Sequence, residues 1–158
     1  GQNSTNRTDI EILYSGLPEP IDIDLDLENE LIYWTDRGDD TINRGPIEIP
    51  NGSTAANRMD RQILVRGVRE AIGVTLDLGR GKLYFTGGTG GRVGMANLDG
   101  TSPMDLVTGT AGLTGISVVE MPKKPAVTPS DASRASPVSG SPPSKLISSV
   151  MWSFLVKG

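Results

Sequence analysis

The chain contains no cysteine and no histidine among its 158 residues, and only 4% of the residues are aromatic. These absences exclude disulfide bonds, thiol nucleophiles, the usual zinc sites and a histidine general base. No run reaches the roughly 18 apolar residues that a membrane-spanning helix needs. The net charge of −4 comes without a basic cluster, which argues against a nucleic-acid partner. We therefore expect neither nucleic-acid binding nor a membrane span.

The compartment is not fixed by the sequence. The chain starts at Gly1 without an apolar signal region. Three glycosylation sequons, at Asn3, Asn6 and Asn51, favour a secretory route only slightly, because serine and threonine are abundant. A secreted domain of this size can also lack disulfides.

Two segments of the chain repeat each other without a gap. Residues 21–27 lead into residues 31–36, and 51 positions later residues 72–78 lead into residues 82–87 in the same way. The match extends upstream, where residues 6–13 resemble residues 57–64. A period of about 40–50 residues built from short strands is typical of β-propeller blades. The sequence therefore predicts an all-β fold made of four-stranded antiparallel blades.

Alternating and β-favouring runs place the strands of each unit. The expected strands are 10–13, 21–27, 31–35 and 62–65 in the first unit and 72–78, 82–86, 93–98 and 105–107 in the second. A glycine- and proline-containing stretch, residues 45–56, is expected to be an inserted loop, and residues 79–81 a tight turn.

These boundaries predict a partial propeller over residues 8–121. It consists of a blade end (8–17), two blades (18–68 and 69–110) and the start of another blade (111–121). Residues 122–145 are rich in Ser and Pro, so we expect a disordered linker there. Residues 146–158 form an apolar tail that is too short to cross a bilayer.

The repeated residues resemble the YWTD repeat, also called the low-density-lipoprotein-receptor class B repeat. That resemblance implies a six-bladed, TolB-like propeller, similar to fungal and bacterial stand-alone members, in which the motif residues join neighbouring blades. The second unit departs from the pattern, with Phe85 in place of Trp and Gly87 in place of Asp. The residues to which the resemblance assigns this structural role are Asp26, Tyr33, Trp34, Thr35, Asp36, Asp77, Tyr84, Phe85, Thr86, Asp99 and Gly100.

The chain is short for a closed ring, because six blades of about 42 residues need about 250 residues. An open arc exposes sheet edges and apolar blade faces. Three explanations stay open: a fragment of a longer propeller, self-assembly of several chains to complete a ring, or a stand-alone arc.

Acidic residues alternate along one predicted strand, at Asp22, Asp24 and Asp26. Clustered carboxylates suit calcium. The same residues could instead accept hydrogen bonds at blade junctions, and only Asp26 has an acidic counterpart, Asp77. We therefore predict no cofactor, with calcium at these three positions as the weaker alternative.

Residues 86–94 resemble the glycine-rich turn of short-chain dehydrogenases. A phosphate-binding turn of that kind must be followed at once by a helix. A strand is expected here instead, so we do not predict nucleotide binding.

The loop after the motif strand carries Arg37, Asp39, Asp40 and Arg44, and loops at one end of a propeller commonly bind partners. We predict a non-enzymatic binding or scaffold module for a protein or small ligand, with no catalytic residue. The alternative is part of a metal-dependent propeller hydrolase of the lactonase type. That alternative requires acids from several blades to converge on one point.

Overall fold

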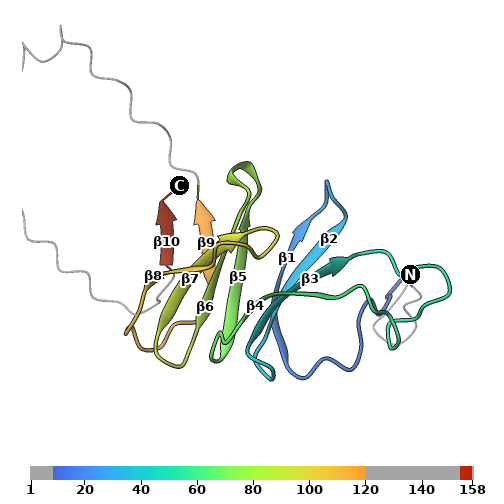
Figure 1. Ribbon diagram of the computed structural model, residues 1–158, viewed down its shortest axis with the longest axis horizontal. Helices are drawn as coiled ribbons and strands as arrows, with labels where there is room; N and C mark the ends of the chain where they lie inside the picture. The colour runs from blue at the N-terminus through green and yellow to red at the C-terminus, as the bar shows by residue number, and fades with distance from the viewer. Residues whose placement is uncertain (1–8, 120–153, 158) are drawn as a thin grey trace, which may run out of the picture.

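Two four-stranded antiparallel sheets stand side by side in the computed structural model, which describes residues 9–119 and 154–157 (Figure 1). The first sheet has the order β1 (Pro20–Asp26), β2 (Leu31–Asp36), β3 (Thr41–Pro46) and β4 (Gln62–Arg66). The second has the order β5 (Ala71–Asp77), β6 (Lys82–Gly87), β7 (Arg92–Asn97) and β8 (Met104–Val107). This arrangement confirms the predicted all-β class.

Three short elements complete the described chain. A single 3₁₀ turn, η1 (Leu78–Arg80), joins β5 to β6. Beyond the second sheet, β9 (Ile116–Val119) pairs in parallel with β10 (Phe154–Lys157). Within the described ranges, no helix is long and apolar enough to pass through a membrane.

The internal repeat is preserved in the strand register. The β1–β2 pairing shifts between Pro20 and Ile23, and the β5–β6 pairing shifts between Ala71 and Val74. A second shift, between Ile42 and Asn43 in the first sheet, recurs between Val93 and Gly94 in the second. Each irregularity recurs after 51 residues, so the two sheets are two copies of one structural unit.

The hydrophobic core lies between the two sheets. The first unit contributes four buried side chains to it, and the second unit contributes five. They are Tyr33, Ile42, Val65 and Val68 on one side and Ala71, Val74, Leu83, Phe85 and Ala96 on the other. Neither sheet could bury these residues alone, so each unit depends on its neighbour, as expected for a repeat protein.

Two of the predicted elements, the loop at residues 45–56 and the strand at residues 10–13, differ from the structure. Residues 45–56 are not wholly a loop, because β3 continues to Pro46. Asn, Gly and Pro disfavour strands in isolation, but β3 here pairs with β2 along its whole length. The tight turn predicted at residues 79–81 is confirmed, as a single 3₁₀ turn closed by Gly81 with a φ of 65°.

The strand predicted at residues 10–13 is absent, because no described strand lies beside it to pair with. The linker predicted at residues 122–145 lies outside the described residues. Of the predicted tail, only residues 154–157 are described, as β10.

Candidate functional site

The motif threonines connect each unit to the next. The Thr35 hydroxyl accepts a hydrogen bond from the Asp22 amide at 3.0 Å and donates to the Ile72 carbonyl at 2.9 Å. The Thr86 hydroxyl accepts from the Gly73 amide at 2.9 Å and donates to the Thr114 carbonyl at 2.6 Å. The motif threonine thus joins its own sheet to the following segment, by the same geometry in both repeats.

The motif tyrosine of the first sheet reaches the second sheet. The Tyr33 hydroxyl donates to the Leu98 carbonyl at 3.3 Å, and Arg44 Nη1 donates to the same oxygen at 2.9 Å. Gly100, with a φ of 84°, packs so closely that a Cβ there would lie 2.6 Å from the Leu64 carbonyl oxygen. The Leu98–Gly100 turn of one unit is therefore fitted to the sheet of the other.

The aspartates that end β1 and β5 fold the turns that follow them. Asp26 accepts hydrogen bonds from the Asn29 amide and side chain, at 3.1 and 2.8 Å. Asp77 accepts from the Arg80 amide at 3.0 Å and from its guanidinium at 2.8 Å. Asp99 similarly binds the hydroxyl and amide of Thr101, and these bonds hold the pKa of Asp99 below its ordinary value. These three carboxylates stabilise turns.

The other two candidate metal ligands bridge the two sheets. Asp22 accepts from its neighbouring Ile23 amide and, with its second oxygen, from the Val74 amide of β5 at 3.0 Å. Asp24 does the same with the amides of Leu25 and Leu76. Among the described residues, no group of three or more acidic side chains is placed to hold a metal ion. Gly73 and Thr75 stand at the equivalent positions of β5, so these carboxylate bridges belong to the first junction alone.

Replacing Asp22 with alanine is expected to lower the free energy of unfolding by about 1–3 kcal/mol, because the buried Val74 amide loses its acceptor. Urea unfolding measures the loss, and hydrogen exchange should accelerate at the Val74 amide. The control is Glu28→Ala, at an exposed position in the adjoining turn, which should change stability by less than about 0.5 kcal/mol. Equal effects of the two substitutions would contradict this account.

The motif tryptophan lies on the outer face of the first sheet. Trp34 is 2% exposed, and its ring centroid lies 4.8 Å from that of Tyr14 at an interplanar angle of 42°. The Arg58 guanidinium lies over the Tyr14 ring, 3.9 Å from its centroid. The sequence analysis missed both Tyr14 and Arg58, because neither belongs to the motif and their contacts join distant segments. Arg58 was visible only as the repeat counterpart of Arg7.

Tyr14 should make stability fall at alkaline pH. Burial raises the pKa of its hydroxyl from 10.0 to about 12. The unfolded chain therefore loses this proton near pH 10, while the folded chain keeps it, so the stabilisation is full below pH 10 and is lost towards pH 12. Tyr14→Phe also removes the hydrogen bond to the Pro46 carbonyl, worth about 0.5–1.5 kcal/mol. The stability gap between wild type and Tyr14→Phe, measured by urea unfolding, should narrow from pH 8 to pH 11; a constant gap would contradict the assignment.

Loops from both units meet at one end of the molecule, which we call the loop end (residues 37–40, 67–70 and 88–91). Asp40 accepts from the Glu70 amide at 2.9 Å, and the Glu70 carboxylate accepts from the Thr89 hydroxyl at 2.6 Å. Arg37 forms an ion pair with Glu19 there, with both side chains more than 40% exposed. The Asp40–Glu70 hydrogen bond thus joins the loops of the two units at this polar end.

The candidate loop residues are only partly brought together. Arg37, Asp39 and Asp40 lie at the loop end, where Asp39 also accepts from the Thr41 hydroxyl and lies 3.8 Å from Arg61. Arg44 does not belong to this loop, since it is in β3 and its guanidinium is bonded to Leu98 and Gln62. Its charge therefore serves the junction between the sheets.

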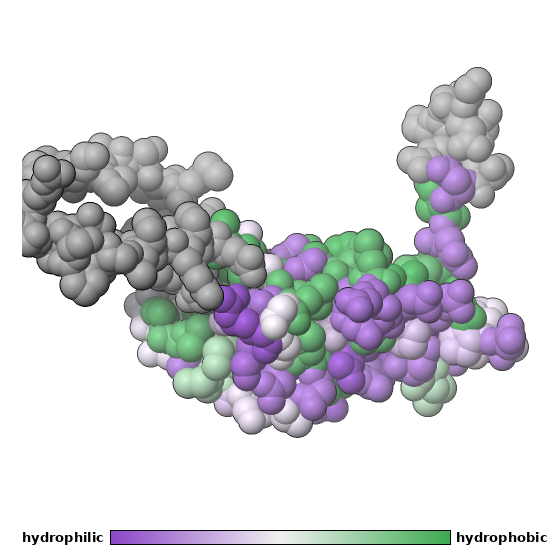
Figure 2. Space-filling view, turned by 90° about the horizontal axis from the view of Figure 1, so that it is seen from above, coloured by the Kyte–Doolittle hydropathy of each residue, from purple (hydrophilic) through white to green (hydrophobic). Residues whose placement is uncertain are grey.

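The opposite end of the sheets is where β1 and β5 finish. It exposes Leu27 and its repeat counterpart Leu78, which are 70% and 45% exposed. Figure 2 looks onto this end and shows hydrophobic residues interspersed with hydrophilic ones. None of the exposed large hydrophobic residues of the described chain lies in the loop end, so the two ends differ in this respect.

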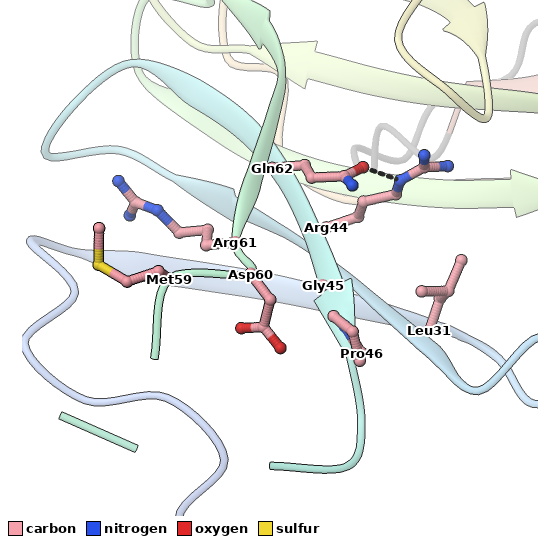
Figure 3. A pocket seen from close by; sticks show the side chains of 8 residues that line it. All are labelled: Leu31, Arg44, Gly45, Pro46, Met59, Asp60, Arg61 and Gln62. Atoms are coloured by element: carbon pink, nitrogen blue, oxygen red, sulfur yellow. Dashed lines mark hydrogen bonds between the residues drawn. The ribbon is translucent and has the colours of Figure 1, made fainter. Parts of the chain in front are cut away.

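A cavity of about 260 Å³ lies beside the end of β3 (Figure 3). Its polar groups already have partners: Arg44 Nε donates to Gln62 Oε1 at 2.8 Å, and Asp60 is paired with Arg58 at 2.7 Å. Hydrogen bonds from Arg58 also hold the pKa of Asp60 below its ordinary value. The cavity therefore offers no free acid or base. Its lining residues are Leu31, Arg44, Gly45, Pro46, Met59, Asp60, Arg61 and Gln62.

The glycine-rich stretch at residues 86–94 is a strand–turn–strand, made by the end of β6 and the start of β7. A helix does not follow it. The stretch thus lacks the helix N-terminus on which a dinucleotide phosphate would rest.

Comparison with known proteins relates the chain to LDL-receptor-like propellers, although no protein-family model matches it. It is 35% identical over 97 residues to a protein named low-density lipoprotein receptor-related protein 1 from Pyricularia oryzae, covering 57% of this chain and 31% of that protein. It is 32% identical over 116 residues to a 3-hydroxyacyl-CoA dehydrogenase-like protein from Cochliobolus heterostrophus, covering 68% of this chain and 24% of that protein. The chain thus spans less than a third of either fungal relative.

A solved structure shares the arrangement of the sheets. A chain in the crystal structure of a nidogen/laminin complex superposes with a TM-score of 0.54 and 28% identity, over 66% of this chain and 38% of that one. Mouse low-density lipoprotein receptor-related protein 5 is 31% identical over 91 residues, which is 58% of this chain and 5% of that receptor. Together with the repeated motif contacts, these similarities place the chain among the YWTD-repeat β-propeller proteins, and its two sheets are YWTD-type blades.

Proposed function

We propose that the chain is a non-enzymatic, protein-binding part of a larger six-bladed propeller and that it binds through the loop end. One observation carries the proposal. The motif aspartates and threonines stabilise turns and blade junctions, whereas the loop end has exposed charged side chains and is joined across the two blades by the hydrogen bond from the Glu70 amide to Asp40. The exposed charged residues of the loop end are Arg37, Arg69 and Glu70, and Arg37 is paired with the neighbouring Glu19.

The relatives support a protein partner. The solved neighbour belongs to a complex of two proteins, nidogen and laminin, and two of the similar proteins bear receptor names. The dehydrogenase-like name of the third relative finds no support in the residues of this chain, because residues 86–94 form a strand–turn–strand. A lactonase-type site is also disfavoured, since Asp22 and Asp24 each use both oxygens on backbone amides.

The test compares three forms of the 158-residue chain as baits: wild type, Arg37→Glu with Glu70→Lys, and Glu28→Ala at the opposite end. Each is immobilised and exposed to extracellular and membrane proteins of the source organism, and the enriched proteins are quantified by mass spectrometry. The proposal expects a protein that the wild type and Glu28→Ala enrich equally and that the double variant enriches at least about tenfold less. Identical enrichment by all three baits would remove the loop end as the binding surface.

A parallel assay tests the enzymatic alternatives. NADH formation from NAD⁺ and 3-hydroxybutyryl-CoA, and hydrolysis of δ-valerolactone with added Ca²⁺, should both stay at the rate of the protein-free control. Turnover above that rate, abolished by Asp22→Asn, would replace the binding proposal with a catalytic one.

A further inference from the structure

The loop between β3 and β4 is an insertion that the second blade lacks. It takes up residues 47–61, whereas residues 98–103 are enough to join the equivalent strands β7 and β8. In Figure 1 the insertion extends from the side of the first blade that faces away from the second. It leaves the sheet at Pro46, the end of β3 opposite the loop end. Because a blade forms without such an insertion, its residues are free to serve another purpose.

Hydrogen bonds fix the insertion on both sides of its middle. The Arg58 guanidinium donates to the Glu48 carbonyl at 2.8 Å. On the other side, the Ser15 amide donates to the Ala55 carbonyl at 3.0 Å. Residues 50–53 lie between these two anchor points, so their position relative to the first blade is set by contacts on either side.

A tight turn at residues 50–53 presents Asn51 to solvent. The Ser53 amide donates to the Pro50 carbonyl at 2.9 Å, and Gly52 has a φ of 82°, which suits the third position of a type II turn. Asn51 and Gly52 are both exposed, and a Cβ at Gly52 would meet no atom within 4 Å. The turn therefore has open space around it, enough for a bulky group on its asparagine.

Asn51 differs from the other asparagines of the described residues because its side chain is free. Each of the others uses its side-chain amide in a hydrogen bond to a residue two to four positions away. Within the part of the chain that the structure describes, the Asn51 side chain forms no such bond. Its Nδ2 atom can therefore be modified without the loss of a contact. The bonded asparagines are Asn29, Asn43, Asn57 and Asn97.

The free asparagine lies in an acceptor sequence for N-glycosylation, Asn51-Gly52-Ser53. We propose that Asn51 carries an N-linked glycan in the natural protein. The exposed turn gives the glycan room, and the unbonded side chain lets it be attached at no cost in contacts. The proposal also assigns the protein to the secretory route. It goes beyond the proposed function and is independent of the loop end, since the insertion leaves the first sheet at the opposite end.

The donor in this modification is an oligosaccharide linked to a lipid pyrophosphate. Asn51 Nδ2 forms a bond with the anomeric carbon of the first sugar, and the bond between that carbon and the pyrophosphate oxygen breaks. The bonding electrons leave with the lipid pyrophosphate, and a base of the transferase takes one proton from Nδ2. The product is a bulky, hydrophilic group on the surface of the insertion.

Peptide mapping of the natural protein, isolated from its source organism, tests the proposal. Trypsin cleaves after Arg44 and Arg58 and releases residues 45–58, in which Asn51 is the only acceptor asparagine. A peptide-N-glycosidase acting in water labelled with heavy oxygen converts a glycosylated asparagine into an aspartate that contains the label. Most copies of the peptide should contain labelled aspartate at position 51. Asn57 belongs to no acceptor sequence and should stay unlabelled, which makes it an internal control.

Two substitutions at Ser53 are the matched controls. Its hydroxyl has no hydrogen-bond partner among the described residues, so neither substitution should disturb the fold. Ser53→Ala keeps Asn51 but removes the acceptor hydroxyl, and it should lower the labelled fraction at least about tenfold. Ser53→Thr preserves an acceptor sequence and should retain the label.

Two outcomes would overturn the proposal. The first is a peptide in which Asn51 is unmodified in the natural protein. The second is unlabelled aspartate at position 51 that Ser53→Ala leaves unchanged. That aspartate would come from spontaneous deamidation, in which the Gly52 nitrogen attacks Asn51 Cγ, ammonia leaves, and water opens the resulting ring. Neither readout involves the loop-end variants, so failure here and failure of the binding proposal are distinguishable.

Discussion

Trp34→Ala should lower the free energy of unfolding by about 3–5 kcal/mol, the range for removing a large buried aromatic side chain. Trp34 is 2% exposed and packs against the ring of Tyr14. The substitution leaves a cavity between β2 and the segment around Tyr14, and β2 cannot shift to close it because its neighbours on both sides hold its register. Urea unfolding followed by circular dichroism measures the loss.

The second repeat supplies the matched control for Trp34. Phe85 occupies the equivalent position and is fully buried, so Trp34→Phe tests ring size alone. The Trp34 Nε1 atom is buried without a hydrogen-bond partner in the described structure, so removing it breaks no bond. We expect Trp34→Phe to cost less than about 1.5 kcal/mol. A cost of less than about 1 kcal/mol for Trp34→Ala would show that the motif tryptophan does not hold the blade together.

The internal repeat made the fold predictable, because the same pattern of strands occurs twice in the sequence. Strands β5 to β8 were placed within two residues of their observed ends from alternating residues and turns alone. Within the two sheets, the strand that was missed is β3, which contains Asn43, Gly45 and Pro46, whose local preferences oppose a strand. Its counterpart β7 was predicted, so subtracting the repeat offset of 51 from the bounds of β7 would have located β3. In β3, pairing with the neighbouring strand β2 thus outweighs the low strand preference of its Asn, Gly and Pro residues.

The contacts that define the candidate surfaces were much less predictable. Alternation placed Asp22 and Asp24 on one side of a strand, but it could not show that their second oxygens reach the amides of β5. Those bonds depend on how two sheets stack, which strand periodicity does not encode. The same limit applies to Arg44, which the sequence placed in a loop and the structure places in β3, against the Leu98 carbonyl.

Arg58 offers the clearest example of a residue whose importance only the structure reveals, and its loss should rank with that of Trp34. Its side chain is 1% exposed and donates to the carbonyls of Leu13, Pro46 and Glu48 at 2.8–2.9 Å and to the Asp60 carboxylate at 2.7 Å. One guanidinium thus joins the segment before the first blade, the end of β3 and the long loop before β4.

Arg58→Met keeps much of the side-chain volume but removes every one of these donors. It leaves three carbonyl groups without this partner and the Asp60 carboxylate without its counter-charge, so we expect a loss of about 3–5 kcal/mol in urea unfolding. Arg58→Lys should recover only part of it, because an ammonium group cannot donate in the planar fork. Arg61→Met is the control: Arg61 is 30% exposed and lies 3.8 Å from Asp39, and its loss should cost less than about 1 kcal/mol.

The pH dependence of unfolding separates the ion pair of Arg58 from simple packing. Hydrogen bonds from Arg58 lower the pKa of Asp60 from its ordinary 3.8. The stabilisation of the folded chain by charged Asp60 is therefore complete above pH 3.8. It is lost as the pH falls through the lower pKa that Asp60 has in the folded state. In Arg58→Met this acid-dependent part should disappear, so the stability gap to wild type should shrink below pH 3.8. A gap that stays constant down to pH 2 would mean that Arg58 acts through its carbonyl contacts and its packing on Tyr14, and not through Asp60.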